Sequence, residues 1–303
     1  MTLDVRAALK EGIARLRAAH VPSDTLAAEI LLMHVLGRDR TWLYTNPESL
    51  LDPAAGEKYF ALIARRASGE PAQYLTGKQE FWGLEFEVTL AVLIPRPETE
   101  HVVEVALERL GARGIKINMK TGAPSPPLRV ADVGTGSGCL AVALAHELPH
   151  AEIVATDISA AALEVARRNA VRHAVSDRIH FVECDLLGAS SGSPLVPLTS
   201  SLDLIVSNPP YVARNEAATL QREVRDHEPD AALFGGPTGV ETYARLIEQS
   251  GALLRPGGIL VLELGYNSAG EVRKVFHVEQ HWANVSITND LAGIPRVLAA
   301  VRV

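Results

Sequence analysis

The segment Val130-Ala131-Asp132-Val133-Gly134-Thr135-Gly136-Ser137-Gly138 carries the first clear indication of the fold. Its apolar first half predicts a buried strand, and its glycines predict a loop whose main chain comes close to a ligand. The glycines alternate, whereas a dinucleotide-binding fingerprint has two residues between its second and third glycines. An acid precedes the loop and can help to bind an ammonium group. We therefore expect the methionine end of S-adenosylmethionine to bind at Asp132, Gly134, Thr135, Gly136, Ser137 and Gly138.

Strands and helices alternate along the chain after this loop begins. Strands are predicted at 129–133, 152–157, 179–183, 202–207 and 259–263, with two more near 284–288 and 295–302. Helices are predicted at 139–147, 160–173 and 240–254. Such alternation indicates an α/β fold with a mainly parallel sheet. Ligands bind such sheets at the carboxyl ends of their strands, so residues at those ends are candidate site residues.

Two of these strand ends carry acids. Asp157 ends the second strand about twenty residues after the glycine loop, a position that suits an acid binding a ribose diol. The alternative is that Asp157 caps the helix that starts near Ser159. Asp185 follows the third strand and could reach the adenine amine, with Leu186 against the ring, although a structural role is equally open.

Asn208-Pro209-Pro210-Tyr211 follows the fourth apolar run and suits methyl transfer to a planar nitrogen. Such a nitrogen is a poor nucleophile because its lone pair is delocalised. The Asn208 oxygen and a carbonyl of the Pro-Pro turn can accept its two hydrogens, and fixed acceptor dipoles favour the transition state. The prolines stiffen the loop, and Tyr211 offers a flat face, although a plain Asn-Pro turn is the alternative. We expect Asn208, Pro209 and Tyr211 to be catalytic, and Pro210 to bind substrate with them.

The N-terminal part of the chain is predicted to be helical. Apolar residues recur at helical spacing from Val5 to Leu16, from Leu26 to Val35 and within 53–67. We expect a small bundle that docks substrate, because a compact methyltransferase core does not need the bundle to fold. Residues 80–88 are predicted to form a hairpin, and a helix is predicted from Pro97 to about Leu110.

Length and composition narrow the class of protein. The 303 residues suffice for two domains. A net charge of −7 argues against stable nucleic-acid binding. Cys139 and Cys184 form neither a metal-binding nor a disulfide pattern, and no metal is expected. No signal peptide or apolar span of membrane length is visible, so the cytoplasm is the expected location. The sequence does not reveal the oligomeric state, and a monomer is taken as the default.

Further motifs join those above: Ile94 to Glu100, Val206 to Tyr211, Glu228-Pro229 with Ala231-Ala232-Leu233, Gly235-Gly236 with Gly239, Pro256-Gly257-Gly258, and Asp290 to Gly293 with Arg296-Val297. Together they make a specific combination. Over nearly its whole length the chain resembles the peptide-chain release factor glutamine N5-methyltransferases, the PrmC/HemK family.

The resemblance implies three parts: a helical bundle at 1–75 that docks the release factor, a linking β-hairpin at 76–96, and a methyltransferase domain at 97–303. That domain would be a seven-stranded, Rossmann-like, class I S-adenosylmethionine-dependent fold. A flexible loop is expected at about 111–127, longer than the usual connection, and another at 190–201. The glutamine common in the family after Glu263-Leu264-Gly265 is absent, since Tyr266 follows.

The resemblance also implies an activity. The methyl group of S-adenosylmethionine would pass to the side-chain amide nitrogen of the glutamine in the Gly-Gly-Gln motif of class I release factors, supporting translation termination and leaving S-adenosylhomocysteine. Asn208 and the Pro209 carbonyl would hold the glutamine amide, and Tyr211 would line its slot. Gly134 to Gly138 and Asp157 would hold the cofactor, and Asn208 would lie near both ligands. A structural or gating role is implied for Arg96 to Glu100.

Three alternatives remain open. One is methylation of a glutamine in a ribosomal protein, with the same site and a different docking partner. Another is adenine N6-methylation of DNA or RNA, in which an Asn-Pro-Pro-Tyr site binds a flipped base; the acidic balance weighs against it. The last is a cofactor-binding scaffold without activity, against which the intact glycine loop and Asn-Pro-Pro-Tyr motif stand.

Overall fold

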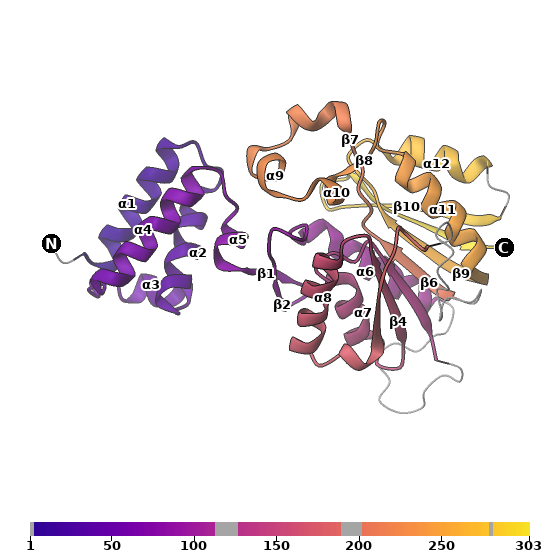
Figure 1. The fold of residues 1–303 in the computed structure, drawn as a ribbon, viewed down its shortest axis with the longest axis horizontal. Helices are drawn as coiled ribbons and strands as arrows, with labels where there is room; N and C mark the ends of the chain where they lie inside the picture. The colour runs from indigo at the N-terminus through magenta and orange to yellow at the C-terminus, as the bar shows by residue number, and fades with distance from the viewer. Residues whose placement is uncertain (1–2, 113–126, 189–201, 279–280) are drawn as a thin grey trace. The chain divides into compact units, whose positions relative to one another are not determined.

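The computed structural model describes residues 3–112, 127–188, 202–278 and 281–303 (Figure 1). Contacts between residues divide the chain into two compact units. The first comprises Met1–Lys78 and Leu220–His227, and the second comprises Gln79–Thr219 and Glu228–Val303. The first unit therefore combines the N-terminal residues with a short segment from much later in the sequence.

The first unit is helical. Its helices are α1 (Val5–Ala18), α2 (Asp24–Leu36), α3 (Arg40–Thr45), α4 (Pro53–Ala67), α5 (Ala72–Thr76) and α9 (Arg222–His227). The Asp4 side chain caps α1 by accepting from the Ala7 amide, and Pro53 occupies the first turn of α4. Gly12 permits α1 and α4 to come close, because a Cβ there would lie 2.0 Å from the Tyr59 hydroxyl.

One buried charge of the first unit forms an ion pair with a residue far away in the sequence. Arg66 of α4 is 5% exposed. Its guanidinium lies 2.5 Å from the carboxylate of Glu223 in α9 and also donates to the Glu70 carbonyl at 3.2 Å. Since a buried charge is stable only when paired, α9 is an integral part of this unit.

A seven-stranded sheet forms the centre of the second unit, as the sequence predicted. The strands, in spatial order, are β10 (Trp282–Asn289), β11 (Pro295–Arg302), β9 (Leu254–Glu263), β6 (Leu202–Ser207), β3 (Arg129–Val133), β4 (Glu152–Asp157) and β5 (Ile179–Glu183). From β9 to β5 neighbouring strands are parallel, whereas β11 and β10 are antiparallel to their neighbours. Only β11 runs against the other strands of this sheet, so the carboxyl ends of the other six strands share one edge.

Helices cover both faces of this sheet (Figure 1). Helices α6 (Glu100–Gly111), α7 (Cys139–Glu147) and α8 (Ala160–Arg172) lie over one face, and α11 (Glu241–Leu253) and α12 (Ala269–Val278) over the other. Alternate strand residues serve opposite cores: Leu204 and Val206 pack toward α6 and α7, whereas Ile205 packs toward α11. Helix α12 was not predicted from the sequence.

The predicted hairpin consists of β1 (Lys78–Phe81) and β2 (Leu84–Glu87). Its two turn residues, Trp82 and Gly83, both have positive φ, of 55° and 69°, as the tightest hairpin turns require. The Trp82 amide and indole N–H donate to Glu100 at 2.8 Å and Glu147 at 3.0 Å. These two bonds hold an otherwise unfavourable tryptophan conformation.

The remaining elements are short: η1 (Pro97–Thr99), η2 (Ser176–Arg178), β7 (Val212–Ala213), η3 (Arg214–Thr219), α10 (Asp230–Leu233) and β8 (Phe234–Gly236). Pro97 begins η1, which leads into α6, and α6 ends at Gly111 as predicted. Most of the loop expected at 111–127, and the loop expected at 190–201 up to Ser201, lie outside the described residues.

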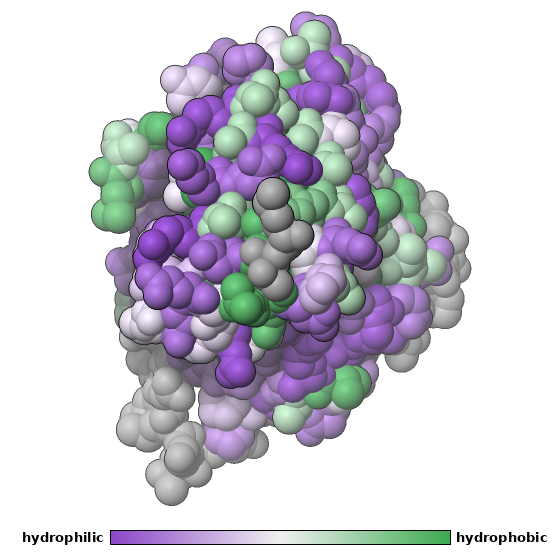
Figure 2. Space-filling view, turned by 90° about the vertical axis from the view of Figure 1, so that its left-hand side faces the viewer, coloured by the Kyte–Doolittle hydropathy of each residue, from purple (hydrophilic) through white to green (hydrophobic). Residues whose placement is uncertain are grey.

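No helix within the described ranges is long and apolar enough to cross a membrane. Figure 2 shows a face on which hydrophilic residues alternate with separate hydrophobic areas. Exposed large apolar residues include Leu26, Tyr44 and Leu50. Scattered apolar residues are ordinary on protein surfaces and do not by themselves mark a binding site.

Candidate active site

A cavity of about 340 Å³ lies at the carboxyl edge of the parallel strands. It is lined by residues that directly follow or end four strands: Gly134 to Ser137 after β3, Asp157 of β4, Asp185 and Leu186 after β5, and Asn208 and Pro210 after β6. Sequence positions far apart therefore meet in one cavity, where open α/β sheets bind ligands. Its volume lies within the usual range for sites of small molecules and cofactors.

The glycine loop is shaped by its main chain. Gly138 has a φ of 82°, and a Cβ there would lie 3.1 Å from the Ala166 side chain of α8. Its amide donates to the Thr135 carbonyl, and the Thr135 amide donates to the Thr156 carbonyl of β4. Gly138 is the N-cap residue directly before α7 and is not among the residues that line the cavity. Gly138 therefore contributes through its backbone conformation, which lets the loop turn back toward Thr135 and pack against α8.

Asp157 ties this loop to the neighbouring strand. One carboxylate oxygen accepts from the Gly136 amide and the other from the Ser159 amide, both at 2.9 Å. Burial raises the pKa of Asp157 above its usual value, whereas these bonds lower it. The cap of α8 is Ser159, whose hydroxyl accepts from the Ala162 amide. Asp157 also lines the cavity, so its carboxylate is in reach of a ligand hydroxyl.

Asp132 lies beneath the loop rather than on the cavity wall. It is fully buried, and one carboxylate oxygen accepts from the Thr135 hydroxyl at 2.6 Å and the Ala141 amide at 3.0 Å. The other oxygen has no hydrogen-bond partner among the described residues. Burial raises the pKa of Asp132 to about 7. The carboxyl group thus braces the loop against α7, and its expected part in cofactor binding stays a prediction.

Asp185 and Leu186 both line the cavity. Asp185 forms an ion pair with Arg245 of α11, another lining residue. Leu186 has a φ of 53°, rare for a bulky residue, and its carbonyl accepts from the Thr156 hydroxyl at 2.7 Å. The neighbouring strand therefore holds Leu186 in the conformation that brings it to the cavity.

The four residues of Asn208-Pro209-Pro210-Tyr211 are divided between the cavity and the interior. Asn208 and Pro210 line the cavity, whereas Pro209 is buried and Tyr211 is not among the lining residues. The Tyr211 ring packs at Gly265, where a Cβ would lie 2.6 Å from it, and burial raises its pKa. Its expected role in lining the substrate slot stays a prediction.

Glycines of β8 and the following turn let another part of the chain lie directly against this motif. A Cβ at Gly235 would lie 2.3 Å from the Pro210 carbonyl, and one at Gly239 would lie 2.4 Å from the Tyr211 carbonyl. Glycine at these two positions is therefore a packing requirement of the Asn-Pro-Pro-Tyr turn.

The segment from Ile94 to Glu100 reaches the site through two residues. The Asn208 side-chain nitrogen donates to the Thr99 hydroxyl at 3.1 Å, and Thr99 lines the cavity. The Arg96 guanidinium lies 2.5 Å from the buried carboxylate of Glu228, which also accepts from the Ile94 amide at 3.4 Å. Glu228 directly precedes the lining residue Pro229. This pairing joins two sequence motifs at the cavity wall.

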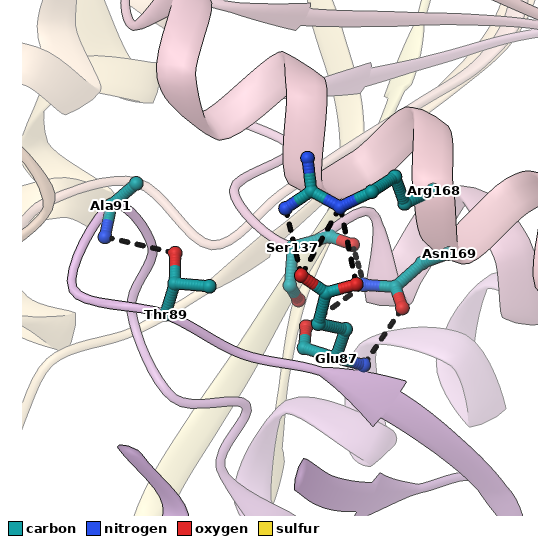
Figure 3. A network of polar contacts seen from close by, with 6 residues as sticks. All are labelled: Glu87, Thr89, Ala91, Ser137, Arg168 and Asn169. Carbon is teal, nitrogen blue, oxygen red and sulfur yellow. Dashed lines mark hydrogen bonds and ion pairs between the residues drawn. The ribbon is translucent and has the colours of Figure 1, made fainter. Parts of the chain in front are cut away.

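Asn169 of α8 was not singled out in the sequence and has a central position (Figure 3). Its side-chain nitrogen donates to the Ser137 carbonyl of the glycine loop at 2.9 Å and to the Glu87 carbonyl at 3.0 Å. Its oxygen accepts from the Glu87 amide at 2.7 Å. Arg168 pairs with the Glu87 carboxylate from the surface. Asn169 thus links the loop, α8 and the end of β2.

Comparisons with known proteins relate the chain to characterised sequences. The family model described as PrmC N-terminal domain matches residues 7–77, and the one described as methyltransferase small domain matches residues 118–226. The release factor glutamine methyltransferase of Koribacter versatilis (strain Ellin345) is 43% identical over 98% of this chain and 98% of its own length. That of Chlorobaculum tepidum is 44% identical over 97% of this chain and 95% of its own length.

One solved structure illustrates the fold. The hMettl16 catalytic domain in complex with MAT2A 3'UTR hairpin 6 superposes with a TM-score of 0.54. The match covers 78% of this chain and 81% of that chain at 20% identity. At this identity the likeness concerns the methyltransferase fold and carries no information on substrate.

Proposed function

Because the chain belongs to the release factor glutamine methyltransferases, we propose that it methylates the side-chain amide nitrogen of the Gly-Gly-Gln glutamine in class I peptide-chain release factors. The methyl donor is S-adenosylmethionine, and S-adenosylhomocysteine is the second product. The observation that carries the proposal is the meeting of Asn208 with the glycine loop in one cavity. Action in translation termination makes the cytoplasm the expected location.

The residues present fit the methyl donor. The glycine loop offers close approach of the main chain, and Asp157 presents a carboxylate at the cavity wall to a ribose diol. Asp185 and Leu186 are assigned to the adenine. Asp132 would act on the methionine ammonium from beneath the loop, where one of its oxygens has no partner among the described residues. When bound, the sulfonium provides an electrophilic methyl group.

The protein contributes orientation to the displacement. In the displacement, the substrate nitrogen would bond to the methyl carbon as the carbon–sulfur bond broke, and the N–H proton would then leave to solvent. The Asn208 oxygen and the Pro209 carbonyl accept the two N–H groups and aim the lone pair at the methyl carbon. The acidity of the N–H increases as the new bond forms, so the transfer step itself needs no general base. Asn208→Ala should lower turnover about 10²–10³-fold.

Transfer of labelled methyl from S-adenosylmethionine to a purified class I release factor tests the proposal. The matched control is the same factor with the glutamine of its Gly-Gly-Gln motif changed to alanine. Label on the intact factor alone supports the proposal. Label on a ribosomal protein fraction or on duplex DNA instead would support methyl transfer but would show that the release factor is not the substrate. No label on any acceptor, with tight cofactor binding, would favour a scaffold.

A further inference from the structure

A chain of two hydrogen bonds leads from Asn208 into the protein interior. The Asn208 side-chain nitrogen donates to the Thr99 hydroxyl at 3.1 Å. That hydroxyl donates to a carboxylate oxygen of Glu263 at 2.6 Å. Thr99 is 2% exposed and Glu263 is 1% exposed. The three residues come from the turn after β6, from η1 and from the end of β9, and form one buried chain of polar groups.

Which group donates in each of these two hydrogen bonds follows from the number of hydrogens that each group carries. A threonine hydroxyl has one hydrogen, and an ionised carboxylate only accepts. Thr99 must therefore donate to ionised Glu263, and its oxygen can then accept only from the amide nitrogen of Asn208. This leaves the Asn208 oxygen as the group available to a substrate N–H. If Glu263 were protonated and donated, Thr99 could donate to the Asn208 oxygen and turn the amide the other way.

The surroundings of Glu263 bear on its charge. Burial raises its pKa to about 7, whereas the Thr99 hydroxyl, Arg296 and Arg96 favour the ionised form. Glu98 opposes ionisation. The titratable and charged groups that interact with Glu263 come from several parts of the fold. They are Arg96 and Glu98 at η1, Arg296 of β11, Tyr211 after β6, Cys139 of α7 and Tyr243 of α11.

We propose that Thr99 and Glu263 are positioning residues that hold the Asn208 amide with its oxygen toward the substrate nitrogen. The inference rests on the proposed function, in which that oxygen accepts a substrate N–H. An amide turned the other way would present its own N–H groups to those of the substrate. Loss of these two hydrogen bonds therefore lowers turnover, although every group assigned to S-adenosylmethionine binding is still present.

Thr99→Val is the first test, because valine keeps the branched shape and loses the hydroxyl. Thr99→Ser is its matched control, because serine keeps the hydroxyl. We expect Thr99→Val to lower kcat about tenfold, as expected for the loss of one orienting hydrogen bond. The affinity for S-adenosylmethionine and the KM for the release factor should change less than about threefold, and Thr99→Ser should retain most of the wild-type kcat.

Glu263→Gln provides an independent test, because glutamine can both donate and accept and so permits either orientation. We expect a lower kcat in this variant. The wild-type kcat should rise between about pH 6 and pH 8 as Glu263 ionises, and the variant should lack this rise. In the double variant with Thr99→Val, kcat should be no lower than in Thr99→Val alone, because both changes interrupt the same chain.

The results that would overturn the proposal are equally specific. They are a Thr99→Val variant with a kcat within twofold of wild type, or a Thr99→Ser variant impaired as much as Thr99→Val. An unchanged kcat together with an unchanged pH profile in Glu263→Gln would also overturn it. Failure of the proposed function is distinguishable, because the wild-type enzyme would then not label the release factor at all.

Discussion

Asn169→Ala should destabilise the second unit strongly. The change leaves three main-chain groups without their partner: the Ser137 carbonyl and the carbonyl and amide of Glu87. A buried polar group left unpaired costs about 1–3 kcal/mol. Two of the three groups are only part-buried and can be reached by water, so about 1 kcal/mol for each group is appropriate. The free energy of unfolding should therefore fall by about 3 kcal/mol.

Arg168→Ala is the matched control, because Arg168 is the neighbouring residue and pairs with the same Glu87. Its side chain is 49% exposed, and surface ion pairs contribute less than about 1 kcal/mol. Urea denaturation measures both variants, and calorimetric titration measures their affinity for S-adenosylmethionine. Asn169→Ala should also weaken that affinity, because Ser137 lines the cavity. Equal, small losses of stability in the two variants would refute the reasoning.

Three further variants test other parts of the second unit. Gly138→Ala should lower the free energy of unfolding by about 1–2 kcal/mol, because alanine is strained at a φ of 82°; an unchanged urea midpoint would contradict this. Tyr243→Phe should cost about 2 kcal/mol in urea denaturation, since its hydroxyl donates to the Glu263 carbonyl and accepts from the Gly265 amide; a cost below about 0.5 kcal/mol would show that water replaces it. Asp132→Asn should flatten the pH dependence of stability, because burial raises the folded-state pKa to about 7. The unfolded chain loses this proton first, so wild-type stability falls as pH rises from about 4 to about 7; parallel profiles would contradict the assignment.

The sheet and the cavity residues were accessible from sequence for a simple reason. Most of the parallel strands are apolar runs, and several site residues end such a run or follow it directly, so their place at the sheet edge requires only the strand to be recognised. Asp157 and Asn208 are examples. Helix α12 was missed because it is short and starts at Ala269-Gly270, residues that give little helical signal.

The supporting contacts could not be read from sequence. Asn169 bonds to main-chain atoms, and any residue type offers the same main-chain atoms. The bond between Thr99 and Glu263 joins residues 164 positions apart, so their proximity depends on the completed fold. Glu263 also ends an apolar strand, where an acid resembles an ordinary solvated strand end. Its burial is a property of the fold alone.

The pairing of Arg66 with Glu223 has a consequence for biosynthesis. The N-terminus of a growing chain leaves the ribosome first, and N-terminal domains usually fold before those that follow. Here the first unit is unfinished when Lys78 emerges, because its segment Leu220–His227 has not yet been made. Until then Arg66 lacks the carboxylate that pairs with it in the complete unit, and a buried charge without its partner is unfavourable. The N-terminal helices should therefore reach their final stability only late in translation, and a fragment ending at Lys78 should remain short of it.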